Sequence, residues 1–217
     1  MTDLHWETVT PLMRDVMRTV GASDLCPRFY LAGRTALALQ VGHRRSVDLD
    51  FFSETDEVRP ETHEKVLRTL GKFHPTVVEH IWGNLLLLAD DLRVGFFGYS
   101  YKLVAPTVLA EGVPLAGLVD IGLMKLDAIS GRASRKDFHD LYAIAQRIPL
   151  RDLLALAPEK YTYNRDFEAQ VVRDLVYFER ADQEVPLPLL HAVEWSTVKT
   201  FFREQAIQLG QAWLEDQ

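Results

Sequence analysis

Residues 28–54 read RFYLAGRTALALQVGHRRSVDLDFFSE. The pattern predicts a short apolar strand, a glycine turn, a short helix, a basic turn and a second strand that carries Asp48 and Asp50. Side chains two positions apart on a strand point to the same face, so these carboxylates are expected side by side, near Gly33 and Thr35. Paired carboxylates bind hard divalent cations such as Mg2+, and a glycine turn that opens a helix offers backbone N–H groups to an anion. The segment therefore predicts a site for a metal-bound nucleoside triphosphate.

A second interpretation of Asp48 and Asp50 is a strand face that is simply solvated. Aspartate is depleted in strands, yet here the two flank Leu49 between bulky apolar residues. This placement, together with the glycine turn upstream, favours the metal site.

The composition is that of a soluble globular protein, with 47% apolar and 25% charged residues in a chain of 217. This length suits one large domain or a compact two-lobed one. No apolar run reaches about 18 residues, so no transmembrane helix is expected. The N-terminus lacks the pattern of a secretory signal. A single cysteine, Cys26, excludes an internal disulfide, and the cytoplasm is the expected compartment.

The net charge of −7 argues against a protein that binds nucleic acid over its whole surface. Two short basic runs, residues 43–45 and 132–136, are candidates for a local basic patch. The other interpretation is a solvated turn and a solvated helix end. His43 and His139 are expected at the surface, and no Cys or His cluster has the spacing of a zinc site.

Apolar periodicity predicts an α+β layout with a mixed sheet in the first half of the chain. The predicted helices there cover residues 3–20, 35–41 and 61–71, and the predicted strands cover residues 29–32, 47–52, 76–81, 84–89, 92–101 and 113–115. Asp90 and Asp91 fit a tight hairpin turn between two of these strands.

From residue 118 onward the pattern is mostly helical. Helices are predicted over residues 118–130, 134–148, 150–157 and 165–181, with a closing helix within residues 191–215. Gly131 is expected to end the first of them, and Pro186 and Pro188 form a stiff connector. The predicted division is a sheet-bearing lobe over residues 1–117 and a helical lobe over residues 118–217.

Three groups of residues carry a resemblance to a known family. The first reads YLAGRTALAL (30–39) followed by HRRSVDLDFF (43–52), the second contains Lys125 and the run RASRKDFHDLY (132–142), and the third reads WSTVKTFF (195–202). Together they resemble the AbiEii/AbiGii toxin family, which are nucleotidyltransferases of the DNA polymerase beta superfamily.

The resemblance implies a polymerase-beta-like fold: a small mixed sheet with flanking helices, then a helical lobe, with the site in the cleft between them. It implies that Asp48 and Asp50 hold Mg2+, which neutralises the triphosphate and helps to activate the attacking hydroxyl. The further residues implied are Gly33, Arg34, Thr35, Ser46 and Lys125 for nucleotide binding, and Lys136 and Asp137 for catalysis. The family resembles toxins that transfer a nucleotide from an NTP to an RNA such as the tRNA acceptor end. An antitoxin protein encoded alongside is the partner that this implies.

Lys125, Lys136 and Asp137 have other interpretations when the residues are considered alone. Lys125 stands in an apolar helix, so its ammonium group must reach water or an anion. Lys136 and Asp140 are four positions apart and fit a surface ion pair. Asp137 has no basic residue four positions later.

Two positions depart from the family's pattern. Arg34 stands where a second glycine is usual, and its side chain either blocks the approach of a phosphate or supplies the contact itself. Gly95 stands where related enzymes commonly place a third carboxylate, which accepts the hydroxyl proton, and glycine cannot accept a proton. These departures leave an alternative open: a catalytically impaired relative that binds a nucleotide or a protein partner.

Overall fold

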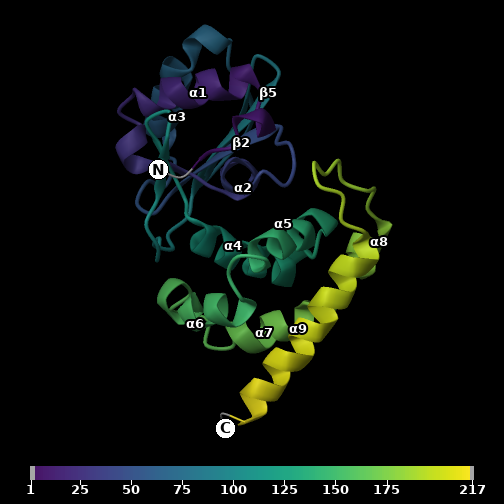
Figure 1. The fold of residues 1–217 in the computed structure, drawn as a ribbon. Coiled ribbons are helices and arrows are strands. Elements are labelled where there is room, and N and C mark those ends of the chain that lie inside the picture. Colours follow the sequence, from purple (N-terminus) through teal and green to yellow (C-terminus); the bar gives the residue numbers. More distant parts are fainter. Residues whose placement is uncertain (1–2, 216–217) are drawn as a thin grey trace. The chain divides into compact units, whose positions relative to one another are not determined.

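The structure is a computed structural model and describes residues 3–215. The chain divides into two compact units, one ending at Gly117 and the other beginning at Leu118. The first holds the sheet, and the second is built mainly from helices (Figure 1). The chain is therefore an α+β protein with a mixed sheet and flanking helices, as the sequence predicts.

A mixed sheet forms the centre of the N-terminal unit. Within residues 3–215 it has seven strands, in the order β3-β4-β5-β2-β1-β7-β6. They are β1 (Tyr30–Leu31), β2 (Asp48–Ser53), β3 (Thr76–Ile81), β4 (Asn84–Ala89), β5 (Leu92–Gly98), β6 (Val108–Ala110) and β7 (Val113–Leu115). Strand β2 pairs in parallel with β5, and β1 pairs in parallel with β7, while the other neighbours are antiparallel.

Strand β2 lies between β5 and β1, and its register fixes what surrounds the acidic residues. Asp50 lies opposite Gly95 of β5. Phe52 lies opposite both Phe97 of β5 and Tyr30 of β1. Because paired residues point to the same face of a sheet, the acidic residues of β2 share their face with this glycine and these rings.

The opposite face of β2 belongs to the hydrophobic core. Leu49 and Phe51 are fully buried there. The Phe51 ring stacks on Phe96 with 4.9 Å between ring centroids, and Phe29 meets Phe96 edge to face at 5.2 Å. The core thus anchors one side of β2 and leaves its other side to the acidic residues.

Three α-helices accompany the sheet: α1 (Pro11–Gly21), α2 (Gly33–Val41) and α3 (Pro60–Thr69). Thr10 caps α1 by accepting a hydrogen bond from the Met13 N–H, and Pro11 occupies the first helical position, where no N–H is needed. The prediction that this helix begins at residue 3 is therefore wrong, and Trp6–Thr8 form a short 3-10 helix instead. Gly42 ends α2 in the left-handed conformation, with φ of 71°.

Strand β6 was not predicted. It forms a hairpin with β7 through Glu111 and Gly112, whose φ values are 50° and 81°. Two positive φ values in succession are typical of the tight turns that join antiparallel strands. A strand of three residues is too short to show a period-two pattern.

The C-terminal unit consists of helices around an aromatic core. They are α4 (Leu118–Arg132), α5 (Arg135–Ala145), α6 (Leu150–Lys160), α7 (Phe167–Asp174), α8 (Glu179–Gln183) and α9 (Trp195–Glu215). The ring of Phe138 contacts those of Phe178, Trp195 and Phe202 at centroid distances of 5.1, 5.8 and 5.4 Å. The long helix α9 packs against α5 and α7 (Figure 1).

Two features of the helical unit differ clearly from the prediction. Gly131 lies inside α4, and the turn comes at Ala133, whose φ is 47°. The single helix predicted over residues 165–181 is two helices, α7 and α8. Leu175 and Phe178 lie in the break between them and are both buried, so the apolar spacing gives no sign of the break.

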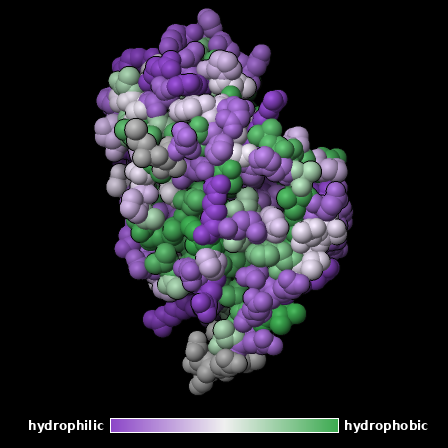
Figure 2. Space-filling model, in the orientation of Figure 1, coloured by the Kyte–Doolittle hydropathy of each residue, from purple (hydrophilic) through white to green (hydrophobic). Residues whose placement is uncertain are grey.

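The surface of the N-terminal unit is mostly hydrophilic on the face drawn in Figure 2. Exposed apolar side chains of this unit include Val78, Ile81 and Trp82, on β3 and the turn after it. Among residues 3–215, no helix combines the length and the apolar character needed to cross a membrane.

Candidate active site

Asp48 and Asp50 stand two positions apart on β2, with their side chains on one face. Asp48 is only 6% exposed, whereas Asp50 is half-buried. The two oxygens of Asp50 face different neighbours. A Cβ added at Gly33 would lie 3.6 Å from Asp50 Oδ2, and one added at Gly95 would lie 3.2 Å from Asp50 Oδ1. The Asp50 carboxylate therefore stands between the glycine turn and strand β5.

The glycine turn opens helix α2 directly after β1. Gly33 has φ of 64°, a conformation that favours glycine, and it is the first residue of the helix. The residue before the helix is Ala32, whose methyl side chain cannot cap the N–H groups of the first turn. The helix dipole adds partial positive charge here. The end of α2 beside Asp50 thus suits a phosphate group.

Thr35 and Ser46 form a buried hydrogen-bond network with β2. Their hydroxyl oxygens are 2.7 Å apart, and Thr35 Oγ1 also donates to the backbone carbonyl of Asp48. Ser46 Oγ lies 3.4 Å from Asp48 Oδ1. Both side chains are almost fully buried, so they tie α2 to β2 and hold Asp48 in place. A direct contact between either hydroxyl and a nucleotide stays a prediction.

Arg34 brings a cation to Asp48 and Asp50, which together form the carboxylate pair. Arg34 Nη2 lies 3.1 Å from Asp48 Oδ2, and the arginine side chain is 25% exposed. The guanidinium group offsets the charge of one of the two carboxylates. Because the same fork of N–H donors matches both phosphate and carboxylate, this placement favours a side chain that can contact a phosphate over one that only blocks it.

Gly95 occupies the position expected for a third carboxylate, and the ring of Phe97 fills the space over it. A Cβ added at Gly95 would lie 2.3 Å from Phe97 Cε2, far closer than real atoms approach. Phe97 follows two positions later on β5 and so shares the face of Gly95. An aromatic side chain therefore takes the space that an acidic one would need.

The donor set of the carboxylate pair suits Mg2+ as part of a metal–nucleotide complex. Mg2+ is commonly held by one or two carboxylates together with substrate phosphates and water, and Asp48 and Asp50 offer such oxygens on one face. No group of three or more His, Cys, Asp or Glu side chains within residues 3–215 could hold a metal ion. The nucleotide and water would have to complete the coordination shell.

In the helical unit, Lys125 of α4 belongs to a buried charge cluster, made of Lys125, Arg132, Asp137 and Asp140. Lys125 Nζ lies 3.0 Å from Asp137 Oδ1 and 2.7 Å from Asp140 Oδ2. Arg132 donates hydrogen bonds of 2.7 and 2.9 Å to the two oxygens of Asp137. Both aspartate side chains are fully buried and that of Lys125 is 8% exposed, whereas the Arg132 side chain reaches the surface and is 51% exposed. The cluster pairs two cations with two carboxylates.

The pKa of the Asp137 carboxyl reflects this setting. Burial raises the pKa, but the hydrogen bond from Arg132 and the charge of Lys125 outweigh burial, and the pKa lies below its ordinary value. Asp137 is therefore ionised at neutral pH, and both of its oxygens accept hydrogen bonds from Lys125 and Arg132. A carboxylate so engaged is suited to holding the Lys125 ammonium group in place. Its direct part in catalysis stays a prediction.

Three expectations about polar side chains are wrong. Asp140 is buried and pairs with Lys125, so it is not the surface residue expected beside Lys136. His139 is also buried, and its ring lies 5.5 Å from that of Trp195. His43 is buried as well. Lys136, in contrast, is half-exposed on the first turn of α5.

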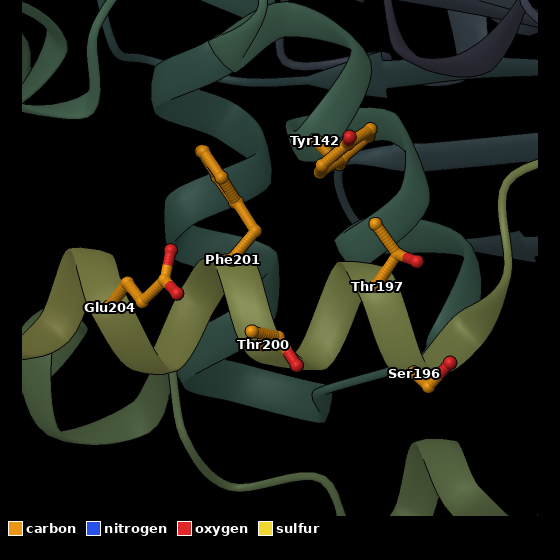
Figure 3. A pocket seen from close by; sticks show the side chains of 6 residues that line it. All are labelled: Tyr142, Ser196, Thr197, Thr200, Phe201 and Glu204. Atoms are coloured by element: carbon orange, nitrogen blue, oxygen red, sulfur yellow. The ribbon is translucent and has the colours of Figure 1, made fainter.

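A separate open pocket of about 410 Å³ lies in the helical unit (Figure 3). Its lining residues are Tyr142 of α5 and Ser196, Thr197, Thr200, Phe201 and Glu204 of α9. Figure 3 shows the α9 side chains along the helix with the Tyr142 ring beside them, and Tyr142 and Phe201 meet edge to face at 5.1 Å. This lining has one carboxylate and no cation, so it does not offer the paired acids and phosphate-binding groups found around β2.

Four residues that shape these sites were not among the predicted site residues. Arg132 and Asp140 complete the buried charge cluster, Phe97 covers Gly95, and Arg93 lies opposite Asp48 on β5. The spacing of two between Gly95 and Phe97 on a predicted strand was an available signal. The cluster depends on how α4 packs against α5, for which the local pattern holds no signal.

The sequence is similar to a described protein family and to a protein of another organism. Residues 15–81 match a family described as the nucleotidyl transferase AbiEii toxin of type IV toxin–antitoxin systems. The uncharacterized protein aq_aa25 of Aquifex aeolicus (strain VF5) is 34% identical over 201 residues, which cover 88% of this chain and 93% of that protein.

Two solved structures share the fold over most of the chain. JHP933 from Helicobacter pylori has a TM-score of 0.57 at 17% identity, covering 94% of this chain and 91% of its own. MenT4, a nucleotidyltransferase toxin from Mycobacterium tuberculosis H37Rv, has a TM-score of 0.59 at 17% identity, covering 92% of this chain and 82% of its own. At 17% identity the two solved structures show that the fold is shared. The family match and the Aquifex relative are similarities of sequence. The chain belongs to the AbiEii family of nucleotidyltransferase toxins.

Proposed function

We propose that the chain transfers a nucleotide from an NTP to a hydroxyl group of an RNA, with Mg2+ as cofactor. One observation carries the proposal: the carboxylate pair stands beside the N-terminus of α2, so oxygen ligands for a metal lie next to N–H donors for a phosphate. Membership of the AbiEii family supports nucleotidyl transfer as the class of reaction.

Within this proposal each residue around β2 has a distinct task. Asp48 and Asp50 hold Mg2+, which when bound would neutralise the triphosphate and help to activate the acceptor hydroxyl. The N–H groups of Gly33 and Arg34 donate to phosphate oxygens, and the Arg34 guanidinium adds a second contact. Thr35 keeps Asp48 aligned through its hydrogen bond to the Asp48 carbonyl.

The helical unit is proposed to supply the remaining functional residues. Lys125 would bind the pyrophosphate leaving group, and Asp137 would act as a positioning residue, because its carboxylate fixes the Lys125 ammonium group. Lys136, half-exposed next to Asp137 in the chain, is proposed as a further phosphate contact.

The proposed acceptor is RNA, with the tRNA acceptor end as the first candidate. The chain would act in the cytoplasm as the toxin of a two-gene system, with an antitoxin protein encoded alongside as its partner. The description of the matching family as a type IV toxin–antitoxin toxin supports this biological setting.

A second candidate is a catalytically impaired relative that binds a nucleotide or a protein partner. The observation that favours it is Gly95 under the ring of Phe97, which leaves no acidic side chain next to Asp50 on β5. Slow transfer, or binding without transfer, would follow if no other group accepts the hydroxyl proton.

The deciding experiment incubates purified protein with Mg2+, each labelled NTP in turn, and total tRNA. Transfer of label is expected with at least one NTP, and it should disappear with a chelator and in the Asp48→Ala variant. Asp91→Asn is the matched control, because this exposed residue of the β4–β5 turn lies outside the site. No label above the Asp48→Ala background with any NTP would reject the proposed transfer to tRNA. Nucleotide binding that persists in that case would support the second candidate.

A further inference from the structure

Strand β5 carries two side chains, Arg93 and Phe97, to which the proposed chemistry gives no role. Arg93 lies opposite Asp48 and Phe97 lies opposite Phe52, so both share the face of the carboxylate pair. Gly95 stands between them and adds no side chain. Next to the carboxylate pair, β5 thus presents a cation and an aromatic ring that covers the glycine between them.

The two sides of Asp50 are different. On one side, β1 leads into Gly33 and the N-terminus of α2, and on the other side lies β5. Asp50 Oδ2 is the oxygen close to the Gly33 position, and Oδ1 is the one close to the Gly95 position. If the triphosphate takes the α2 side of Asp50, the side left for the acceptor hydroxyl is that of β5, which neighbours β2 at a spacing of about 4.8 Å.

Phe97 offers an aromatic surface at the place where the acceptor would lie. Its ring is half-buried, and its centroid is 5.2 Å from that of Phe52. Phe52 lies 5.7 Å from Tyr99, which in turn lies 5.0 Å from Tyr101. Aromatic side chains in a row are the usual stacking surface for unpaired bases, since every base has a π-face.

Arg93 offers the charge that a nucleic-acid backbone requires. Its side chain is exposed, and no hydrogen bond or ion pair engages it within the described residues. Four strand positions separate Arg93 from Phe97, or about 13 Å, a distance that a short single strand can span with one base on the ring and a phosphate at the guanidinium.

We infer that β5 is the acceptor-binding strand: Phe97 stacks on an unpaired base near the 3′ end of a single-stranded RNA, and Arg93 binds one of its phosphates. The inference rests on the proposed function, because it gives the α2 side to the triphosphate. Strand β5 carries a positive charge and no acidic residue, which favours a polyanionic acceptor over a cationic small molecule.

The first test measures RNA binding without NTP, so that it does not depend on catalysis. The probe is a fluorescein-labelled single-stranded RNA of about 12 nucleotides, within the usual site size for such proteins. Phe97→Ala and Phe97→Leu should each raise the Kd by about 10-fold, and Phe97→Trp should keep it within about twofold. Phe97→Leu retains most of the apolar volume and guards against a loss of folding. Tyr163→Ala, at a residue that is 97% exposed in the helical unit, is the control and should bind as the wild type.

The second test uses salt to detect the phosphate contact. Loss of one contact to a single strand should reduce the slope of log Kd against log salt concentration by about 0.7 in Arg93→Ala. Arg68→Ala removes the same charge from the exposed side of α3 and should leave the slope unchanged.

The transfer assay then separates the inference about β5 from the proposed function. In an active enzyme, Phe97→Ala should raise the KM for RNA by about 10-fold and leave the KM for NTP unchanged. A rise in the KM for NTP alone would place the ring on the nucleotide side and overturn the inference. Wild-type protein that does not bind the RNA, or variants that bind it as tightly as wild type, would overturn it too. Failure of label transfer with RNA binding intact would instead reject only the proposed function.

Discussion

The carboxylate pair of β2 and the buried charge cluster of the helical unit both place two aspartates next to cations, but the carboxylates differ in how deeply they are buried. Asp50 is half-buried, and Asp48 has one arginine at 3.1 Å. In the cluster, Lys125 contacts both carboxylates, and both aspartates are fully buried.

This difference separates a place that can take a ligand from a place that fixes geometry. A half-buried carboxylate such as that of Asp50 can exchange a neighbour for a metal ion at small cost. A carboxylate whose oxygens are bonded inside the protein cannot, because removing a partner leaves a buried charge unpaired. Substitutions at β2 should therefore affect mainly activity, whereas substitutions in the cluster should also lower stability.

The largest effect is expected from Asp50→Asn. An amide is a poor ligand for Mg2+, so kcat/KM for label transfer should fall by at least about 100-fold. Because Asp50 is half-buried, the melting temperature should change little. Asp91→Asn serves as the control for both measurements. An Asp50→Asn enzyme with near wild-type transfer would show that the carboxylate pair does not carry the chemistry.

Asp137→Asn should have the largest effect on stability. The substitution removes one of the two carboxylates that pair with Lys125, and it removes the negative charge that Asp137 presents to Arg132. Because a buried charge loses its partner, the free energy of unfolding should fall by about 3 kcal/mol. Urea unfolding measures this loss. Asp152→Asn, at an exposed site on α6, should cost less than about 0.5 kcal/mol. A loss of similar size in both variants would contradict the contrast between buried and exposed charges.

The contribution of Asp137 should also depend on pH. Its pKa in the folded state lies below the ordinary value, so the ionised carboxylate stabilises the fold at pH values above about 4. That contribution is lost as the pH falls through the lowered folded pKa. The difference in unfolding free energy between wild type and Asp137→Asn should therefore be full at pH 7 and shrink below about pH 4. A difference that is constant from neutral to strongly acidic pH would argue that packing, and not charge, is responsible.

Arg34→Ala should have a moderate effect, mainly on nucleotide binding. If the guanidinium contacts a phosphate, the KM for NTP should rise by about 10-fold, since a charged hydrogen bond contributes about 1.5 kcal/mol or more. Stability should change by less than about 1 kcal/mol, as for a partly exposed ion pair. Arg34→Lys keeps the charge without the fork of donors, so its KM for NTP should lie between those of the wild type and Arg34→Ala. A lower KM in Arg34→Ala would instead show that the side chain obstructs the phosphate.

Gly95→Ala should have the smallest effect, on stability. The new methyl group would meet the Phe97 ring at 2.3 Å, so the ring must swing away, at a cost of about 1 kcal/mol. In the double variant Gly95→Ala/Phe97→Leu, the penalty for the added methyl should decrease, because the ring is gone. Thermal unfolding of the four proteins completes the cycle. Equal penalties in both backgrounds would show that the ring is not what fills this space.

The part of the fold around β2 could be predicted because its signals are local. The alternation of Asp48, Leu49, Asp50 and Phe51 has the period of a strand, and Gly42 marks the end of α2. The hairpin at Asp90 follows from turn chemistry in the same way. Each of these features is decided within a few residues.

The features that could not be predicted depend on contacts between distant segments. Lys125 and Asp140 meet only because α4 packs on α5, so the burial of Asp140 could not be read from its own helix. His139 is buried for the same reason, against Trp195 of α9. The break between α7 and α8 was hidden because the buried side chains keep a helical spacing across it.

The parallel pairing of β2 with β5 has a consequence for how the protein is made. Residues 48–53 pair with residues 93–98, so the carboxylate pair meets the inferred acceptor strand only after the whole intervening segment has left the ribosome. Helix α3 and the β3–β4 hairpin can form earlier, because their contacts are local, whereas long-range parallel pairing is slow. A chain proposed to be toxic to the cell that makes it would therefore emerge inert, and its toxicity would begin only when the sheet closes.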